Sequence, residues 1–328
     1  MHVPYCCPIC QSPLRLFSET LLCEVDNIKY GIINSVPRFC SNENYSESFG
    51  FQWNKFNHTQ LDVYSGVDQS EDRFYLETGW VSDSLDNSLI LEVGSGAGRF
   101  SEVFLRTTDG TLYSVDYSSA VDANKQNNQI YGDRLRLSQS SIYALPFRDN
   151  TFDKIFCLGV LQHTPSFEDS VGALIQKAKP GGEIVVDFYH IKGWYTRIHS
   201  KYLFRPFLKR LPKQFLLALI KLNIGWMLGL FDLLCKLRLG IFTRFIPITD
   251  VRGFPRNLSP SQRREWAIMD TFDAFSPQYD NPKRLEEVVS MFVDRRCKIT
   301  FAGLIEHSSG TAMVVRAVKM SKDKPEMV

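Results

Sequence analysis

The sequence predicts an α/β fold with a doubly wound parallel sheet, a small module before the sheet and a helical insert within it. Apolar strand-like runs alternate with helical stretches over residues 89–190, which is typical of βαβ units. A glycine-rich turn follows the first of these runs. The chain has 328 residues and 44% of them are hydrophobic, so it is long enough to bury a sizeable core.

The charges of the chain are nearly balanced. The 38 Lys and Arg residues stand against 36 Asp and Glu residues, which gives a formal net charge of +2. Neither a basic nor an acidic excess points to a class of partner, so any partner must be inferred from local patches. The hydrophobic content, with only 23% charged residues, excludes wholesale disorder.

Residues 1–40 are predicted to form a separate module rich in thiols. Five of the eight cysteines lie there, and the N-terminus shows no secretory signal. We therefore expect a cytoplasmic, reducing environment. Clustered thiols in such an environment favour metal binding or free thiols over disulfides.

The metal ligands of this module are predicted from the cysteine spacing. Cys7 and Cys10 form a C-x-x-C pair that can hold one ion, and Cys23 follows after 12 residues. The expected position of a fourth ligand holds Asp26, whose carboxylate can also bind zinc. A module held by its own small core without metal is the alternative. Other candidate ligands are Cys6, Cys40 and His2.

Residues 41–88 are predicted to form a lid segment over a pocket. The segment is polar but carries more aromatic residues than a passive linker needs, and rigid rings suit pocket walls. The alternative is that these rings only pack the segment onto the main domain. They are Phe49, Phe51, Trp53, Phe56, Tyr64, Phe74, Tyr75 and Trp80.

The predicted core follows over residues 89–193, and residues 282–320 complete it with a helix and a β-hairpin. The expected core strands are 89–93, 111–115, 134–138, 154–160 and 183–189. The expected core helices are 98–106, 118–129 and 166–178.

The strongest functional signal is the turn Gly94-Ser95-Gly96-Ala97-Gly98 after the first strand. Glycine is needed where a ligand lies against bare backbone or where φ is positive. A dinucleotide site would read G-x-G-x-x-G, with its third glycine one place later. Asp116 lies 18 residues after Gly98 at the end of the second strand, where a carboxylate can accept ribose hydroxyls.

The G-x-G-x-G spacing resembles motif I of class I S-adenosylmethionine-dependent methyltransferases, which have a Rossmann-like sheet. Residues 151–165, TFDKIFCLGVLQHTP, resemble the family's fourth strand and the turn after it. Residues 179–182, KPGG, resemble the turn before its fifth strand. The resemblance implies S-adenosyl-L-methionine as cofactor. It also implies a final antiparallel hairpin, which residues 296–318 can supply.

The resemblance assigns cofactor contacts to particular residues. The glycine turn would hold the methionine part and the sulfonium, and Glu92 would support the turn. The family usually contacts the adenine with an Asp, where this chain has Ser141 followed by Ile142. The implied cofactor-binding residues are Glu92, Gly94, Ser95, Gly96, Gly98, Asp116, Ser141 and Ile142.

Residues 1–40 are similar to the zinc-ribbon-like domain of some methyltransferase activator subunits, which also occurs at the N-terminus of some methyltransferases. The pattern is two C-x-x-C pairs, then a Tyr and an Ile before a Pro-containing turn. The run IKYGIINSVPRF supplies the later part. The sequence from Cys23 to Asp26 replaces the second pair. The resemblance implies zinc as the metal.

Three side chains are candidates for handling the methyl acceptor. Methyl transfer needs an aligned nucleophile and, for a hydroxyl, removal of its proton. His163 lies just past the fourth strand, beside the cofactor by family analogy, and imidazole suits a base near neutral pH. The alternative is that His163 only shapes the turn. Tyr189 and His190 follow the fifth strand at the mouth of the same cleft.

Residues 194–281 are predicted to form a helical insert that acts as a substrate lid. From 201 to 248 the insert carries nine Lys or Arg residues and one acid, Asp232. The apolar window 215–235 is nearly long enough to span a bilayer, but charged residues interrupt it. A lid that contacts a membrane surface or holds a lipid-like substrate fits better. The acids and aromatics of 265–280 would suit a hydroxyl-rich substrate, with capping and turn formation as the alternative.

The sequence therefore predicts a methyltransferase that acts on a small or lipid-linked acceptor, such as a hydroxyl of a sugar or of another secondary or cell-surface metabolite. The alternative is an RNA or protein methyltransferase, which the ribbon-like module and the basic insert support. Nucleic acid is disfavoured because the stretch LGVLQHTP replaces the Asn/Asp-Pro-Pro-Tyr/Phe motif of nucleobase amino-methyltransferases. We expect a cytoplasmic protein with peripheral membrane contact through 194–248.

Overall fold

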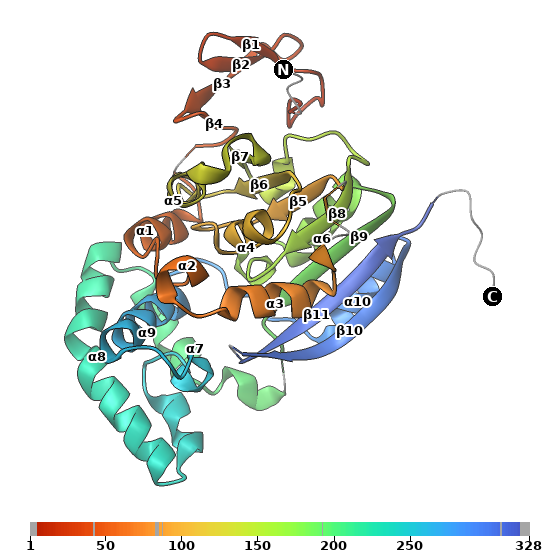
Figure 1. Ribbon diagram of the computed structural model, residues 1–328. Coiled ribbons are helices and arrows are strands. Elements are labelled where there is room, and N and C mark those ends of the chain that lie inside the picture. Colours follow the sequence, from red (N-terminus) through yellow and green to blue (C-terminus); the bar gives the residue numbers. More distant parts are fainter. Residues whose placement is uncertain are drawn as a thin grey trace, which may run out of the picture.

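Two β-sheets and a group of helices make up the computed structural model. The larger sheet has seven strands and the smaller has four (Figure 1). The structure describes residues 5–41, 43–82, 85–86, 88–191, 193–308 and 310–321.

The seven-stranded sheet has the order β10-β11-β9-β8-β5-β6-β7. Strands β5 to β9 run parallel, and the hairpin β10–β11 joins β9 in antiparallel orientation. This confirms the predicted doubly wound sheet and its final hairpin. The strands are β5 (Ile90–Val93), β6 (Leu112–Asp116), β7 (Leu135–Gln139), β8 (Phe152–Cys157), β9 (Ala178–Phe188), β10 (Cys297–His307) and β11 (Gly310–Lys319).

The fourth core strand is shorter at its end than expected. We expected a strand over 154–160, but β8 ends at Cys157. Gly159 has a φ of +76°, which no strand residue adopts, so the chain turns there. The apolar residues after the turn belong to a loop and a 3₁₀ turn at the sheet edge.

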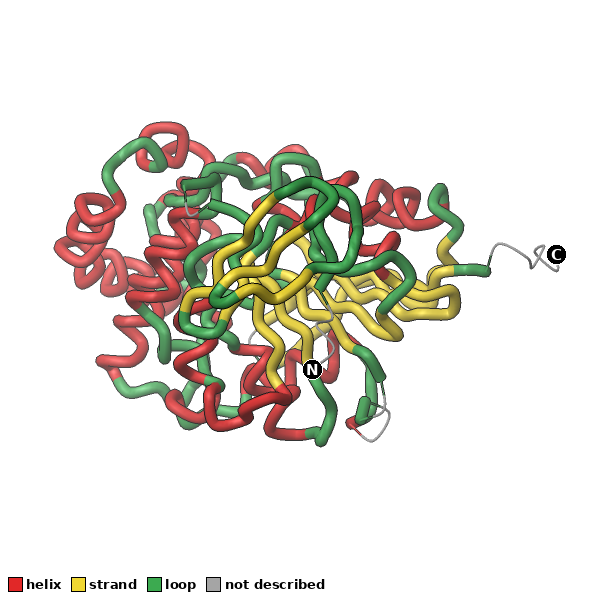
Figure 2. Tube along the Cα trace, turned by 90° about the horizontal axis from the view of Figure 1, so that it is seen from above, coloured by secondary structure: helices red, strands yellow, loops and turns green. Residues whose placement is uncertain are grey.

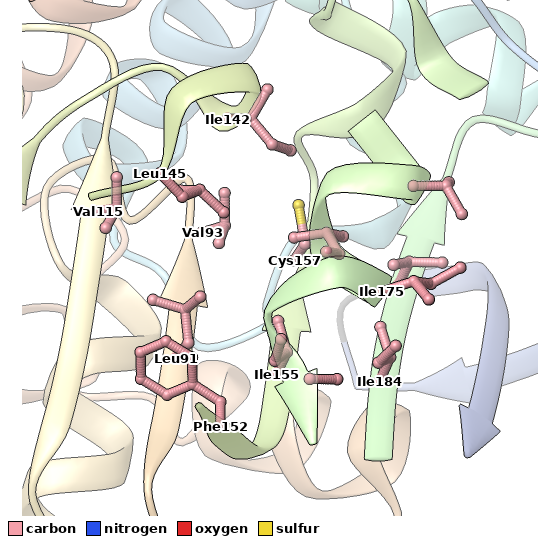
Figure 3. Packing of buried hydrophobic residues seen from close by; sticks show 14 of the residues in the cluster. Leu91, Val93, Val115, Ile142, Leu145, Phe152, Ile155, Cys157, Ile175 and Ile184 are labelled. Atoms are coloured by element: carbon pink, nitrogen blue, oxygen red, sulfur yellow. The ribbon is translucent and has the colours of Figure 1, made fainter. Parts of the chain in front are cut away.

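Helices cover both faces of the sheet because alternate strand residues point to opposite sides. Leu91 and Val93 of β5 belong to an apolar cluster with α6 and α10, whereas Ile90 packs in a second cluster with α3, α4 and α5. Figure 3 shows part of the first cluster between neighbouring strands and α6. These helices are α3 (Gln69–Thr78), α4 (Arg99–Thr107), α5 (Val121–Asn127), α6 (Phe167–Lys177) and α10 (Leu285–Val293).

The N-terminal sheet is an antiparallel meander that lies against β7, the edge strand of the large sheet (Figures 1 and 2). The Phe39 amide donates to the Gln139 carbonyl at 2.8 Å, and the Tyr5 hydroxyl donates to the Leu137 carbonyl at 3.0 Å. The module thus covers part of an otherwise unpaired strand edge. Its strands are β1 (Arg15–Phe17), β2 (Thr20–Cys23), β3 (Ile28–Ile33) and β4 (Val36–Pro37).

The segment after this module is helical, as expected for a lid. It forms α1 (Glu47–Lys55), α2 (Asp62–Ser65) and α3. Its aromatic residues divide into two groups. Phe74 and Trp80 are buried in the core on the α3 side, whereas Phe49 and Trp53 line a cavity described below.

The insert between β9 and α10 is a helical layer with an apolar core of its own. Its long helix α8 packs against α9 through buried residues such as Leu217, Ile220 and Ile224. Ser259 caps α9 in a capping box, and Pro260 occupies its first position. The helices of the insert are α7 (Ser200–Leu208), α8 (Lys213–Lys236) and α9 (Pro260–Phe275).

Short 3₁₀ turns complete the described structure. They are η2 (Gln129–Arg134), η3 (Ile142–Ala144), η4 (Leu161–His163), η5 (Trp194–Arg197), η6 (Gly240–Phe245) and η7 (Val251–Gly253).

The two ends of the insert meet at the end of β9. The Ile191 amide donates to the Lys283 carbonyl at 3.0 Å, and the Lys283 amide donates to the Tyr189 carbonyl at 2.9 Å. The insert therefore leaves the core and returns to it at one place. In Figure 1 it lies to the lower left of the sheet, with α8 outermost.

Candidate functional site

A cavity of about 620 Å³ lies between the large sheet and the insert. The glycine turn and Asp116 line it from the carboxyl ends of β5 and β6, and Val160 and Tyr189 line it from the segments after β8 and β9. β5 and β8 are neighbours at the point where the strand order reverses. Ligands of open α/β sheets bind at this switch point.

The glycine turn has a shape that side chains would block. Gly94 has a φ of +88°, and a Cβ there would lie 2.2 Å from the Val160 Cγ2 atom. Gly96 has a φ of +54°, and its Cβ would lie 3.1 Å from the Trp53 Nε1 atom. Gly98 is not among the residues that line the cavity. It starts α4, where a Cβ would lie 2.3 Å from the Asn124 Oδ1 atom.

Asp116 holds the glycine turn and faces the cavity at the same time. Its Oδ2 atom accepts a hydrogen bond from the Gly96 amide at 2.8 Å. Its Oδ1 atom accepts from the amide and the hydroxyl of Ser118 at 2.8 and 2.7 Å. A carboxylate offers about four lone-pair positions, so three are used and one remains for a ligand hydroxyl. Burial raises the pKa of Asp116.

Glu92 lies beneath the turn rather than in the cavity. Its Oε2 atom accepts hydrogen bonds from the hydroxyls of Ser101 on α4 and Ser114 on β6, the latter at 2.8 Å. Burial raises the pKa of Glu92 to about 7. The side chain therefore connects three elements around the turn, in keeping with the supporting role expected for it.

The segment predicted to contact adenine reaches the cavity through different atoms than expected. Ile142 lines the cavity, but the Ser141 hydroxyl accepts from the Tyr143 amide at 3.2 Å and caps η3. The preceding residue, Ser140, lines the cavity instead. Its buried hydroxyl has no hydrogen-bond partner among the described residues.

His163 lines the cavity between two aromatic rings. The centroid of its ring is 5.0 Å from that of Phe49 and 5.5 Å from that of Tyr189. Its Nδ1 atom lies 3.0 Å from the Tyr279 carbonyl oxygen. Because a carbonyl only accepts, we assign the proton to Nδ1, which leaves Nε2 as the basic nitrogen. Burial lowers the pKa of His163, so the ring is neutral at pH 7.

Ionisable groups surround His163 in this part of the cavity. Burial, followed by the charges of Asp273 and other acids, raises the pKa of Tyr189 well above its usual value. The phenol therefore stays protonated and can donate a hydrogen bond. The Lys201 ammonium lies 4.4 Å from the centre of the Tyr189 ring and pairs with Asp280 at 2.6 Å.

Two acids of α9 also belong to the wall of the cavity. Asp270 and Asp273 both line the cavity. Burial, with a smaller contribution from the Asp273 charge, raises the pKa of Asp270 to about 7. Other acids of the 265–280 stretch have structural partners, since Glu265 accepts from the Thr59 hydroxyl at 2.6 Å.

Not every predicted site residue reaches the cavity. His190 is not among its lining residues, and its backbone forms a β-bridge with Lys283. Three lining cations were missed in the sequence, namely Arg73, Arg99 and Lys201. They come from α3, α4 and α7 and share no motif, so no local pattern could have grouped them.

The predicted metal ligands form one cluster in the N-terminal module. The ligand atoms of Cys7, Cys10, Cys23 and Asp26 all lie within 4.8 Å of one another. The Cys10 and Cys23 sulfurs are 3.5 Å apart, and the Cys7 sulfur is 3.1 Å from the Asp26 Oδ2 atom. Zinc–sulfur bonds of about 2.3 Å place the sulfurs of a tetrahedral site about 3.8 Å apart. The cluster therefore fits zinc closely.

The other candidate ligands lie elsewhere. All eight cysteines are free thiols, and Cys6 and Cys40 are outside the cluster. The Cys40 thiol donates to the Tyr117 carbonyl at 3.8 Å. His2 lies outside the described residues. Within the cluster, the Tyr30 hydroxyl lies 3.3 Å from the Cys7 sulfur and can stabilise a thiolate there.

Comparisons with known proteins agree with this geometry. Residues 91–186 match the family model described as a methyltransferase domain. The chain is 31% identical over 112 residues to a tRNA U34 carboxymethyltransferase of Nautilia profundicola, which covers 34% of this chain and 37% of that protein. It is 28% identical over 107 residues to a sterol 24-C-methyltransferase of Kluyveromyces lactis, covering 31% of this chain and 28% of that protein.

Solved structures that match most of the chain include one of a methyltransferase complex. It is a chain of the complex between the Haloferax volcanii Trm112 methyltransferase activator and a methyltransferase, with a TM-score of 0.50 and 11% identity. The match covers 84% of this chain and 98% of that chain. At this identity it shows a shared fold. The chain spans less than two thirds of the curated relatives it matches, with 37% and 28% of the length of the two proteins named above.

Proposed function

We propose that this chain, which carries a class I S-adenosylmethionine-dependent methyltransferase domain, methylates a hydroxyl of a small or lipid-linked acceptor such as a sugar. One observation carries the proposal. The cavity runs without a break from the glycine turn to His163, Tyr189, Asp270 and Asp273. A single space thus joins a cofactor cradle to a chamber rich in hydrogen-bonding groups, as hydroxyl methylation requires.

The residues present fit S-adenosyl-L-methionine. The glycine turn offers a cradle that a Cβ would fill, and Asp116 keeps one acceptor position for a ribose hydroxyl. Buried polar atoms that line the cavity without a hydrogen-bond partner among the described residues supply further contacts. They belong to Gln52, Ser95, Arg99 and Ser140.

The chain's own residues would prepare the acceptor for an in-line displacement. The cofactor supplies an electrophilic methyl group. The neutral His163 ring can take the proton of an acceptor hydroxyl on Nε2, because the Tyr279 carbonyl holds the proton on Nδ1. The protonated Tyr189 phenol can donate to the acceptor, and Asp270 and Asp273 can accept from its other hydroxyls.

The experiment that tests this proposal offers radiolabelled methyl-S-adenosylmethionine and the purified chain to a host extract. The extract is then separated into lipid-glycan, small-molecule, RNA and protein fractions. We expect the label in the lipid-glycan or small-molecule fraction. Label confined to RNA or protein would contradict the proposal.

An RNA acceptor is the second candidate, and two observations favour it. The relative from Nautilia profundicola bears the name of a tRNA-modifying enzyme. The insert also exposes basic side chains such as Lys221, Lys236 and Arg238. Binding through phosphates would weaken steeply as salt concentration rises, so a salt titration with bulk tRNA distinguishes this candidate.

Two further proposals concern the environment of the chain. The Cys7, Cys10, Cys23 and Asp26 cluster would hold one zinc ion that stabilises the N-terminal module. The chain would be cytoplasmic with peripheral membrane contact through residues 194–248. The exposed apolar side chains of α8 support the membrane contact.

A further inference from the structure

Helix α8 has two apolar faces, and only one of them is covered. Leu216, Ile220, Ile224 and Met227 are buried against the rest of the insert. A second set recurs every three or four residues, which places it on one other side of the helix. Leu222 of this set is 82% exposed. The exposed stripe consists of Phe215, Leu219, Leu222, Trp226, Leu230 and Leu233.

The exposed stripe continues onto neighbouring parts of the insert. Phe207 of α7 is 70% exposed, and Ile241 and Phe242 of η6 are exposed beyond the end of α8. α8 is also, within the described residues, the one helix long and apolar enough to cross a membrane. Because its other face packs on α9, the arrangement suits a helix lying in the membrane surface.

The charges around the stripe are complementary to anionic lipid. Asp232 is the one acid between residues 201 and 248, and Arg263 pairs with it through two contacts of 2.7 and 2.8 Å. The basic side chains of Arg210, Lys221 and Lys236 are exposed. Positive charge beside an apolar stripe is attracted to acidic headgroups.

A second pocket, of about 350 Å³, lies where the insert meets α1. Lys209, Arg210 and Lys213 line it, and so does Glu47. Three positive charges and one negative charge leave +2. None of these four side chains forms an ion pair within the part of the chain that the structure describes.

Two buried hydroxyls line this basic pocket without hydrogen-bond partners among the described residues. Ser48 and Ser276 are each 2% exposed. Ser48 lies in the first turn of α1, whose N-terminus has no side-chain cap. The positive end of the helix dipole adds to the attraction for an anion there. Cations, hydroxyl donors and a helix N-terminus are together the groups that bind phosphate.

The basic pocket adjoins the cavity at Tyr45 and the N-terminal end of α8 at Lys213. Tyr45 lines both the basic pocket and the cavity. Lys213 begins α8, two residues before Phe215 of the stripe. A molecule with an apolar chain, a phosphate and a polar head could thus occupy the three features in that order.

We propose that the methyl acceptor is a phosphate-linked lipid, whose phosphate binds in the basic pocket while its apolar chain lies along the exposed stripe of α8 in the membrane surface. The proposal rests on the proposed function, because it takes the cavity as the site of the head group. It narrows the acceptor to one chemical class. The phosphate contacts also fix the distance of the head group from the membrane.

The first test measures phosphate binding without any activity. Inorganic pyrophosphate is titrated into the full chain by calorimetry, and the double variant Lys209→Ala/Lys213→Ala is compared with wild type. We expect binding to wild type and a loss of about tenfold for each charge-assisted hydrogen bond removed. The control Lys221→Ala/Lys236→Ala also removes two positive charges, but both residues lie on α8 outside the pocket. It should bind like wild type.

The second test measures membrane binding by flotation with phosphatidylcholine vesicles that contain or lack phosphatidic acid. Wild type should float with the acidic vesicles. Leu222→Gln should weaken this binding about tenfold. Ile130→Gln is the matched control, because Ile130 is 81% exposed on η2, away from the insert. Pyrophosphate should compete with the acidic vesicles if the lipid phosphate occupies the pocket.

Several results would overturn the proposal. The proposal fails if wild type does not bind pyrophosphate, or if wild type and Lys209→Ala/Lys213→Ala bind it with equal affinity. This holds even where the variant unfolds at a lower temperature than wild type. In that case the cations only neutralise the C-terminal end of α9. Vesicle binding that is absent would also overturn it, as would a stable dimer that Leu222→Gln dissociates. S-adenosylmethionine affinity is measured on every variant, so a failure of the cofactor site is seen separately.

Discussion

At the scale of single residues, Asp116 carries two tasks with one carboxylate. It holds the Gly96 amide in place and keeps one acceptor position directed to a ligand. Under the proposed ribose assignment, the turn and the ribose contact are coupled. Loss of this side chain would remove a ligand contact and release the backbone that shapes the cradle.

Asp116→Ala should weaken S-adenosylmethionine binding by about 1.5–3 kcal/mol for each hydrogen bond lost to the charged acceptor. Calorimetry on the purified chain measures this. Asp109→Ala is the matched control, since Asp109 is an exposed acid just before the other end of β6. Equal affinity of Asp116→Ala and wild type would rule out the ribose assignment.

Gly94→Ala tests how tightly the cradle is packed. The new Cβ would collide with Val160, and the positive φ adds strain of about 1–2 kcal/mol. Overpacking adds about 1–3 kcal/mol to this loss of unfolding free energy. In the double variant Gly94→Ala/Val160→Ala the Val160 methyl groups are gone, so the overpacking cost should disappear. Compared with Val160→Ala alone, the double variant should therefore lose only the unfolding free energy that corresponds to the backbone strain. Urea denaturation of the four proteins gives the values, and no recovery would contradict the observed contact.

Glu92 makes stability depend on pH, because burial raises its pKa to about 7 from 4.5. Between these values the unfolded chain releases a proton that the folded chain keeps. Folding stability from this group is therefore fully present below about pH 4.5 and is lost as pH rises to about 7. Glu92→Gln should gain up to about 3 kcal/mol relative to wild type across this range.

Urea denaturation at several pH values measures the Glu92→Gln difference. Other buried acids titrate in both proteins, so their contributions to the unfolding free energy cancel in the comparison. Glu306→Gln, at an exposed position on β10, is the matched control. If the difference in unfolding free energy between Glu92→Gln and wild type does not change with pH, Glu92 ionises in the folded chain as it does in the unfolded chain.

At the scale of elements, the N-terminal module is too small to rely on apolar burial alone. The three residues of β1 are all exposed and contribute little to a core, whereas Cys7 and Cys23 are fully buried. A bound ion would join the segment before β1 to the turn between β2 and β3. Stability of such small modules is commonly supplied by metal.

Metal analysis of the purified chain should find about one zinc ion per chain. Cys23→Ser should lower this content strongly, and Asp26→Cys should keep it. Cys40→Ser should leave it unchanged, because Cys40 lies outside the cluster. A metal-free chain with a fully folded module would contradict the zinc proposal.

The elements of the core could be predicted because their signals are local. The run Ile90–Val93 ends at a glycine turn, and Leu112–Asp116 ends at an acid, so the strand ends were evident. Ser140 was missed because the capping of η3 by Ser141 depends on a tight turn that the sequence does not mark.

The cations of the cavity could not be predicted for a different reason. Arg73, Arg99 and Lys201 come together only through packing of distant elements.

At the scale of the whole molecule, the functional features divide between two layers. The sheet supplies the glycine turn and Asp116, and the insert supplies Lys201, Asp270 and Asp273. The N-terminal module lies at the opposite side, against β7. The two sides of the cavity are therefore formed by separate elements of the chain.

The closed ends of the insert have a consequence for the origin of this chain. Because Ile191 and Lys283 are already hydrogen-bonded, the segment between them leaves the sheet and returns to it at one place. Replacing this segment would exchange one acceptor chamber for another without changing the order or the pairing of the strands in the sheet. The joint at the end of β9 is thus a natural place for recombination in evolution, and a defined site for grafting in the laboratory.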